Sequence, residues 1–309
     1  MTTRTSMPRT HSRSSDGAPI VVGVDPAGRS TSAVLWAAEE AERTGRALHL
    51  ISAYPAESAT AGDQASLRSD LAGVARRLTL SDLEYDARFG PAVGVLLEAV
   101  AGGSLLVVGR RGYGGAQRKL VGSTSMAVAA RSQVPVVVAP EQWLQPSMAS
   151  APLVVGVDEH RAQNVSPDRP DPDREALLFA FDRAAQLRVP LIVVHAFEMP
   201  LLDGWSSRDV DSCRGRYEEV VQARLAPWLA AYPDVEVALR CVPGPPRQAL
   251  VDAAQAAQLT VLGRHSGGHL RATLLGSTAR GFLHRADHPV AVVPVPAAED
   301  PEEVDDAGS

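Results

Sequence analysis

Short apolar runs alternate with longer alanine-rich segments through most of the chain. In the first half, runs rich in Val, Leu and Ile predict strands at about 19–24, 47–53, 83–88, 104–109 and 134–139. Segments with helical periodicity predict helices near 30–44, 64–79, 91–101 and 122–132. Strands and helices that alternate in this way are typical of βαβ units around a parallel sheet.

The whole pattern occurs twice. Ile20–Asp25 returns as Leu153–Asp158, and Ala33–Ala37 returns as Ala176–Ala180. Further along, Gly109, Gly122 and Val136 return as Gly263, Gly276 and Val290. The spacing between equivalent residues grows from 133 to 143 and then to 154 positions, so the second copy carries extra residues in two places.

We therefore predict two tandem α/β domains, at 19–140 and 152–296, each a doubly wound, five-stranded parallel sheet. Helices must cover both faces of each sheet, because its strands are too apolar to face water. Residues 141–151 follow neither period and form the predicted linker. We expect a disordered tail at 1–18 without the apolar region of a secretory signal, and a solvated acidic tail at 297–309.

The amino-acid composition narrows the range of possible functions. Hydrophobic residues make up 45% of the chain and aromatic residues only 5%, which fits a core of Val, Leu, Ile and Ala. The net charge of −6 argues against binding to nucleic acid or to an anionic membrane. No stretch approaches the roughly 20 apolar residues of a membrane span. The two cysteines suggest neither a disulfide framework nor a zinc site, and they fit a cytoplasmic location.

A glycine-rich segment follows the fourth predicted strand of the first copy. Gly109 and Gly112 are separated by two residues, and nine more residues lead to Gly122, Ser123 and Thr124, where a helix is predicted to begin. Glycines allow positive φ angles and a close approach of backbone N–H groups to an anion. A helix N-terminus adds free N–H groups and a partial positive charge. Together these features predict a phosphate-binding loop.

The loop differs from two well-known phosphate-binding motifs. It lacks the Gly-Lys-Ser or Gly-Lys-Thr of a Walker A loop, and it follows the fourth strand, unlike a Rossmann fingerprint. The glycines could also make only a turn, with Ser123 as a helix cap. The spacing, the strand-to-helix context and the second copy favour phosphate binding. Arg110 and Lys119, the sole lysine of the chain, are candidate phosphate partners, although a charged loop is commonly just solvated.

These residues resemble the universal stress proteins, in particular their tandem two-domain members of actinobacterial type. The ATP-binding members of that family share the pattern Gly-2x-Gly-9x-Gly-(Ser/Thr), which the first copy matches at every position. The resemblance implies a Rossmann-like, adenine-nucleotide-binding fold in which Asp25 and the backbone around Gly23 and Ala53 hold adenosine. Asp25 could equally stabilise only its own turn. The implied first site comprises Gly23, Asp25, Ala53, Gly109, Arg110, Gly112, Tyr113, Lys119, Gly122, Ser123 and Thr124.

The second copy departs from this pattern. Ser266 stands where the second glycine would be, and an insertion with several acidic residues, 161–173, follows its first strand. Acidic residues beside a phosphate crevice would repel the ligand, so we expect a weaker, altered or empty second site. Its candidate residues are Gly156, Asp158, Gly263, Arg264, Gly267, Gly276, Ser277 and Thr278. Two histidines flank this loop without a third ligand, so we predict no metal site formed by protein groups alone.

Three functions remain open. No arrangement of nucleophile, base or paired carboxylates appears, so we name no catalytic residue. The first hypothesis is an ATP-responsive regulatory protein of the stress response, with or without Mg²⁺, that acts on an unidentified protein partner. The second is a slow ATPase or other nucleotide-dependent enzyme, and the third is a nucleotide-free scaffold.

Assembly is predicted from the last strand of each copy. The runs 134–138 and 288–293 are short and apolar and lie at a sheet margin, which invites association. The family resemblance implies that these strands pair the two copies within one chain, and that two chains form a homodimer.

Overall fold

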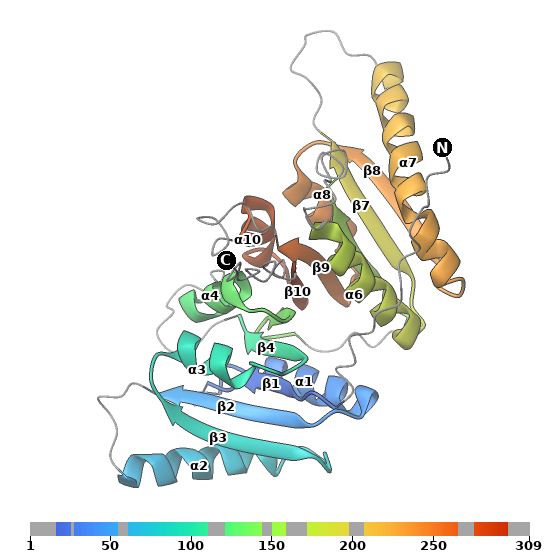
Figure 1. The fold of residues 1–309 in the computed structure, drawn as a ribbon. Coiled ribbons are helices and arrows are strands. Elements are labelled where there is room, and N and C mark those ends of the chain that lie inside the picture. The colour runs from blue at the N-terminus through green and yellow to red at the C-terminus, as the bar shows by residue number, and fades with distance from the viewer. Residues whose placement is uncertain are drawn as a thin grey trace, which may run out of the picture.

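A computed structural model of the chain shows two α/β copies that share a single ten-stranded sheet. The structure describes residues 17–25, 28–54, 61–110, 121–143, 150–158, 172–197, 207–264 and 275–295. The strands follow the order β3-β2-β1-β4-β5-β10-β9-β6-β7-β8. In Figure 1 the sheet runs from β3, beside α2, to β8, beside α7.

The first copy has the elements that its apolar periodicity predicts. Its strands are β1 (Ile20–Gly23), β2 (Leu48–Tyr54), β3 (Leu83–Phe89), β4 (Leu105–Gly109) and β5 (Val136–Ala139). Its helices are α1 (Thr31–Thr44), α2 (Ala61–Ala75), α3 (Ala92–Ala99) and α4 (Ser123–Arg131).

The second copy repeats this order. Its strands are β6 (Leu153–Val157), β7 (Leu191–Phe197), β8 (Val237–Pro243), β9 (Leu259–Arg264) and β10 (Val290–Pro294). Its helices are α6 (Pro172–Leu187), α7 (Ser207–Ala231), α8 (Pro246–Ala253) and α10 (Ser277–Leu283).

Strand pairing is parallel within each copy and antiparallel between them. β5 and β10 pair with Val137 opposite Ala291, which confirms that the last strands join the two copies. Pro135 and Pro289 precede these strands, and their carbonyl oxygens accept hydrogen bonds from the N–H groups of Leu106 (3.0 Å) and Thr260 (3.1 Å). A proline at this position therefore still serves the sheet as an acceptor.

Helices cover both faces of the sheet, as an apolar parallel sheet requires. One core cluster contains residues of α1, α2, α6 and α7, and the other contains residues of α3, α4, α8 and α10. Each cluster includes strand residues from both copies. The predicted doubly wound fold is thus confirmed, and its two cores continue from one copy into the other.

Candidate functional site

The first candidate residue, Gly23, ends β1 beside β4. It is paired with Val108, and a Cβ atom added to Gly23 would lie 3.2 Å from Leu96 Cδ2 and 3.4 Å from Val108 Cγ1. A larger residue would therefore push against α3 and β4. The absence of a side chain lets the chain leave the sheet close to the end of β4.

Asp25 lies in the turn between β1 and α1. Its N–H donates to Ser30 Oγ at 2.9 Å, and its carbonyl accepts from the Gly28 N–H at 3.0 Å. Ser30 is 3% exposed and directly precedes α1. The Asp25 backbone is therefore fixed by the start of the helix, while its side chain is half-buried at the strand end.

Ala53 lies on the neighbouring strand β2 at the same end of the sheet. The Val24 N–H donates to the Ile51 carbonyl at 2.8 Å, and the Ser52 hydroxyl donates to the Val24 carbonyl at 2.9 Å. These bonds join the end of β1 to the segment that contains Ala53. The carboxyl ends of parallel strands form the usual ligand crevice of such a sheet. The structure thus brings Gly23, Asp25 and Ala53 to one edge.

The described ends of the glycine-rich loop lie together at this edge. Gly109 ends β4, and its carbonyl accepts a hydrogen bond from the Ser125 hydroxyl at 2.7 Å. The Gly122 N–H donates to the Arg110 carbonyl at 2.7 Å. Both bonds hold the first turn of α4 against the end of β4.

The start of α4 supplies donors that the helix itself does not use. Gly122 is the residue before the helix, and the first N–H groups after it, from Ser123 onward, have no acceptor within the helix. Ser123 is exposed and Thr124 is half-buried. These groups and the partial positive charge of the helix end can bind an anion.

The expected positive φ angles are not found at the two described glycines that precede helices. Gly122 has φ −65° and Gly276 has φ −57°. Both values are open to any residue, so glycine is not needed there for its backbone freedom. The predicted site residues Gly112, Tyr113 and Lys119 of the first copy and Gly267 of the second lie outside the described residues.

The end of the first strand of the second copy, β6, is held by different side chains from those at the end of β1. Gly156 is as tightly packed as Gly23, with Leu250 Cδ2 at 3.1 Å from an added Cβ atom. The Asp158 N–H, however, donates to a carboxylate, Asp173 Oδ2, at 2.8 Å. Asp173 is 2% exposed and forms an ion pair with Arg224 of α7 at 3.0 Å.

Asp173 is the counterpart of Ser30, because both lie three residues before the equivalent alanines Ala33 and Ala176. Each accepts the N–H of the aspartate that follows the first strand. His195 likewise replaces Ser52, with its Nδ1 atom 3.3 Å from the Val157 carbonyl oxygen. A charged pair and an imidazole thus stand where the first copy uses two hydroxyl groups.

The other candidates of the second copy lie at the end of β9 and the start of α10. Gly263 is the penultimate residue of β9, and Gly276, Ser277 and Thr278 lie at the start of α10. Arg264 ends β9 and is 7% exposed. Burial lowers its pKa, and within the described part of the chain its Nη1 atom has no hydrogen-bond partner.

Sequence reasoning missed Ser30, Ser52, Asp173 and Arg224. Ser30 had a detectable signal, because a serine before an apolar helical run is typical of a helix N-terminus. Arg224 lies far along the chain on a helix whose placement the sequence does not fix.

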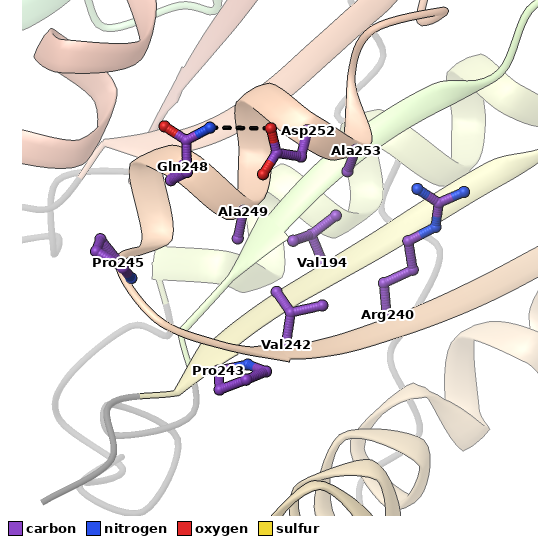
Figure 2. Close-up of a pocket in the computed structure, with 9 residues that line it drawn as sticks. All are labelled: Val194, Arg240, Val242, Pro243, Pro245, Gln248, Ala249, Asp252 and Ala253. Carbon is purple, nitrogen blue, oxygen red and sulfur yellow. Dashed lines mark hydrogen bonds between the residues drawn. The ribbon is translucent and has the colours of Figure 1, made fainter. Parts of the chain in front are cut away.

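A pocket of about 190 Å³ lies elsewhere, in the second copy between β7, β8 and α8. Figure 2 shows Val194 and Val242 beneath α8, with Arg240 to one side and the Gln248–Asp252 hydrogen bond on the helix. None of the predicted nucleotide-binding residues lines this pocket.

Two features are absent from the part of the chain that the structure describes. No helix there combines the length and apolar composition of a membrane span. No three His, Cys, Asp or Glu side chains gather there closely enough to hold a metal ion.

Most of the chain is similar to known protein sequences. A model of the Usp family, described as the universal stress protein family, matches residues 18–140 and 164–294. Universal stress protein Rv2005c of Mycobacterium tuberculosis (strain ATCC 25618 / H37Rv) is 28% identical over 295 residues, covering 88% of this chain and 96% of that protein. Universal stress protein Rv2623 of the same strain is 29% identical over 308 residues, covering 88% and 95%.

Solved structures share the fold. A universal stress protein from Archaeoglobus fulgidus DSM 4304 has a TM-score of 0.62 at 19% identity and covers 90% of this chain and 96% of its own. Protein PA1789 of Pseudomonas aeruginosa PAO1, described as functionally unknown, has a TM-score of 0.62 at 17% identity and covers 91% and 94%.

Proposed function

The chain belongs to the universal stress protein family, and from this membership we propose that it is an ATP-binding regulatory protein of the stress response. The observation that carries the proposal is the match of Gly109, Gly112, Gly122 and Ser123 to the pattern of the ATP-binding members. In this proposal ATP binds mainly to the first copy.

The placement of the described residues supports this assignment. Gly23, Asp25 and Ala53 lie at the carboxyl ends of β1 and β2, where adenosine would bind. The start of α4 lies against the end of β4 and offers unused N–H groups to phosphates. Mg²⁺ that accompanies ATP would be held through the phosphates.

The second copy differs where it would have to receive a nucleotide. Asp173 and Arg224 form a buried ion pair at the turn after β6, and His195 lies beside it. The charge of Asp173, the last residue of the insertion, is thus neutralised by Arg224. The turn nevertheless lacks the small hydroxyl group that the first copy has there. We propose a weaker or empty second site.

The protein would act by presenting different surfaces to a partner with and without ATP, because only differential affinity can drive such a switch. We propose that it does so in the cytoplasm. β5 and β10 are already paired within the chain, so a homodimer would need other surfaces, such as the terminal strands β3 and β8 of the sheet.

Calorimetric titration of MgATP tests the proposal. We compare the wild type with Gly122→Ala/Ser123→Ala and with the matched second-copy control Gly276→Ala/Ser277→Ala. Alanine accepts the φ of both glycines, so both variants should fold. We expect about one ATP per chain, with affinity reduced at least about tenfold in the first variant and unchanged in the control. Absence of binding to the wild type would overturn the proposal and favour a scaffold.

A further inference from the structure

Both described ends of the first glycine-rich loop contact the second copy. The Arg110 guanidinium donates from Nη1 to the Ala286 carbonyl at 2.8 Å, and the Val121 N–H donates to His284 Nδ1 at 3.1 Å. His284 follows the last residue of α10. The residues just after α10 therefore bind the chain immediately before and after the loop.

These contacts act on the phosphate-binding end of the proposed site. Val121 is two residues before Ser123, where α4 begins. The Gly122 N–H donates to the Arg110 carbonyl, so the two contacted ends are also joined to each other. A displacement of His284 and Ala286 would consequently move the first turn of α4 relative to β4.

Among the described residues, the equivalent side-chain atoms do not repeat these two bonds in the opposite direction. The positions equivalent to Arg110, Val121 and His284 are Arg264, Leu275 and Ala130. Alanine offers no side-chain acceptor, so the imidazole bond has no counterpart. Arg264 Nη1 has no hydrogen-bond partner among the described residues, whereas Arg110 Nη1 has the Ala286 carbonyl. Within the described part of the chain, the second copy thus holds the loop ends of the first through two side-chain bonds that the equivalent atoms do not form.

We propose that His284 is a positioning residue for the nucleotide site of the first copy, acting through the Val121 amide and the start of α4. This inference rests on the proposed function. In this proposal the second copy, despite its altered strand end, contributes to nucleotide binding by supplying residues against which the start of α4 is held.

The imidazole must be neutral at Nδ1 to accept this bond, so its proton is carried by Nε2. Partial burial, followed by the charges of Arg280 and Arg110, lowers the pKa of His284. The neutral acceptor is therefore the prevailing form at neutral pH.

The test uses the full chain with three substitutions. His284→Ala removes the acceptor, and His284→Asn keeps an oxygen acceptor close to the Nδ1 position. Arg285→Ala is the matched control, because Arg285 is an exposed neighbour in the same turn. Two quantities are measured: hydrogen exchange of the Val121 amide without nucleotide, and the Kd for MgATP.

We expect His284→Ala to speed Val121 exchange and to raise the Kd for MgATP, each by about fivefold, the size expected for one hydrogen bond. His284→Asn should restore most of both effects, and Arg285→Ala should change neither. Unaltered Val121 exchange in His284→Ala would overturn the inference. Faster exchange with an unchanged Kd, in a protein that does bind ATP, would overturn the inference alone. A wild type that binds no ATP would overturn the proposed function and the inference with it.

Discussion

Glu40 of α1 and Arg183 of α6 occupy equivalent positions in the two copies, and their side chains form a buried ion pair with each other. The two side chains are 7% and 9% exposed. Arg43 also contacts Glu40, and the Arg183 guanidinium lies 4.9 Å from the centre of the Trp36 ring. Burial raises the pKa of Glu40, but Arg183 and Arg43 outweigh it and leave the pKa below its ordinary value.

The Glu40–Arg183 pair should contribute measurably to stability. We expect Arg183→Met to lower the free energy of unfolding by about 2 kcal/mol, because it leaves a buried carboxylate with Arg43 as its remaining partner. A double-mutant cycle with Glu40→Gln, followed by urea unfolding, should give a coupling of at least about 1 kcal/mol. The exposed pair Arg214–Asp211 is the control and should give less than about 0.5 kcal/mol. Additive effects at Glu40 and Arg183 would contradict the prediction.

Ser30 should affect both stability and nucleotide binding, because its hydroxyl holds the Asp25 amide. We expect Ser30→Ala to cost about 1 kcal/mol of unfolding free energy and to weaken MgATP binding several-fold. Ser32→Ala is the control, since the Ser32 hydroxyl donates at 2.7 Å to the distant Glu141 carbonyl. It should cost similar stability and leave the Kd for MgATP unchanged. An equal change of Kd in both variants would show that the effect is not specific to the Asp25 turn.

His288 should make the fold sensitive to acid. Burial lowers its pKa to about 4, against a smaller opposite effect of Asp287, and Nε2 lies 2.7 Å from Thr260 Oγ1. In the unfolded chain the imidazole of His288 takes up a proton below about pH 6.5, whereas in the folded chain it does so only near pH 4. The stability present above about pH 6.5 is therefore lost as the pH falls toward 4. Between pH 7 and 5 we expect a loss of about 2 kcal/mol in urea unfolding. His288→Gln should remove this loss of stability. If the stability of the wild type and that of His288→Gln fall equally between pH 7 and 5, the prediction is refuted.

The ion pair of the second copy should behave as a unit. Asp173→Ser keeps an acceptor for the Asp158 N–H but leaves Arg224 without its carboxylate, and should cost about 2 kcal/mol at neutral pH. Adding Arg224→Met should recover part of this loss, as measured by chemical unfolding. If Arg224→Met lowers the stability of the Asp173→Ser variant by as much as it lowers that of the wild type, the two side chains do not act together.

The fold was largely predictable because its signal is local. Continuous apolar runs mark β1 and β4, the repeat predicts the tandem copies, and the family resemblance implied the observed pairing of β5 with β10. Predicted strand ends differ from those observed by at most two residues. The helix predicted at 64–79 is Ala61–Ala75, the largest displacement among those of the first copy.

The contacts around the candidate site were predictable only in part, because they join distant residues. Spacing located Gly109 and Gly122, but the bonds from Arg110 and Val121 to the second copy depend on how two helices meet across β5 and β10. Aligning the two copies shows that Asp173 replaces Ser30, but it does not indicate that Arg224 is the ion-pair partner of Asp173. Opposite charges at the equivalent positions of Glu40 and Arg183 are the sequence signal of this ion pair between the copies.

The antiparallel junction of β5 and β10 also changes how this protein responds to dilution. Two separate single-copy chains joined at such a junction would dissociate when their concentration fell below their Kd. Here one covalent chain carries both strands, so the local concentration of each strand for the other does not depend on the number of molecules in the cell. The support that the second copy gives to the first is therefore present even in a cell that holds a single molecule.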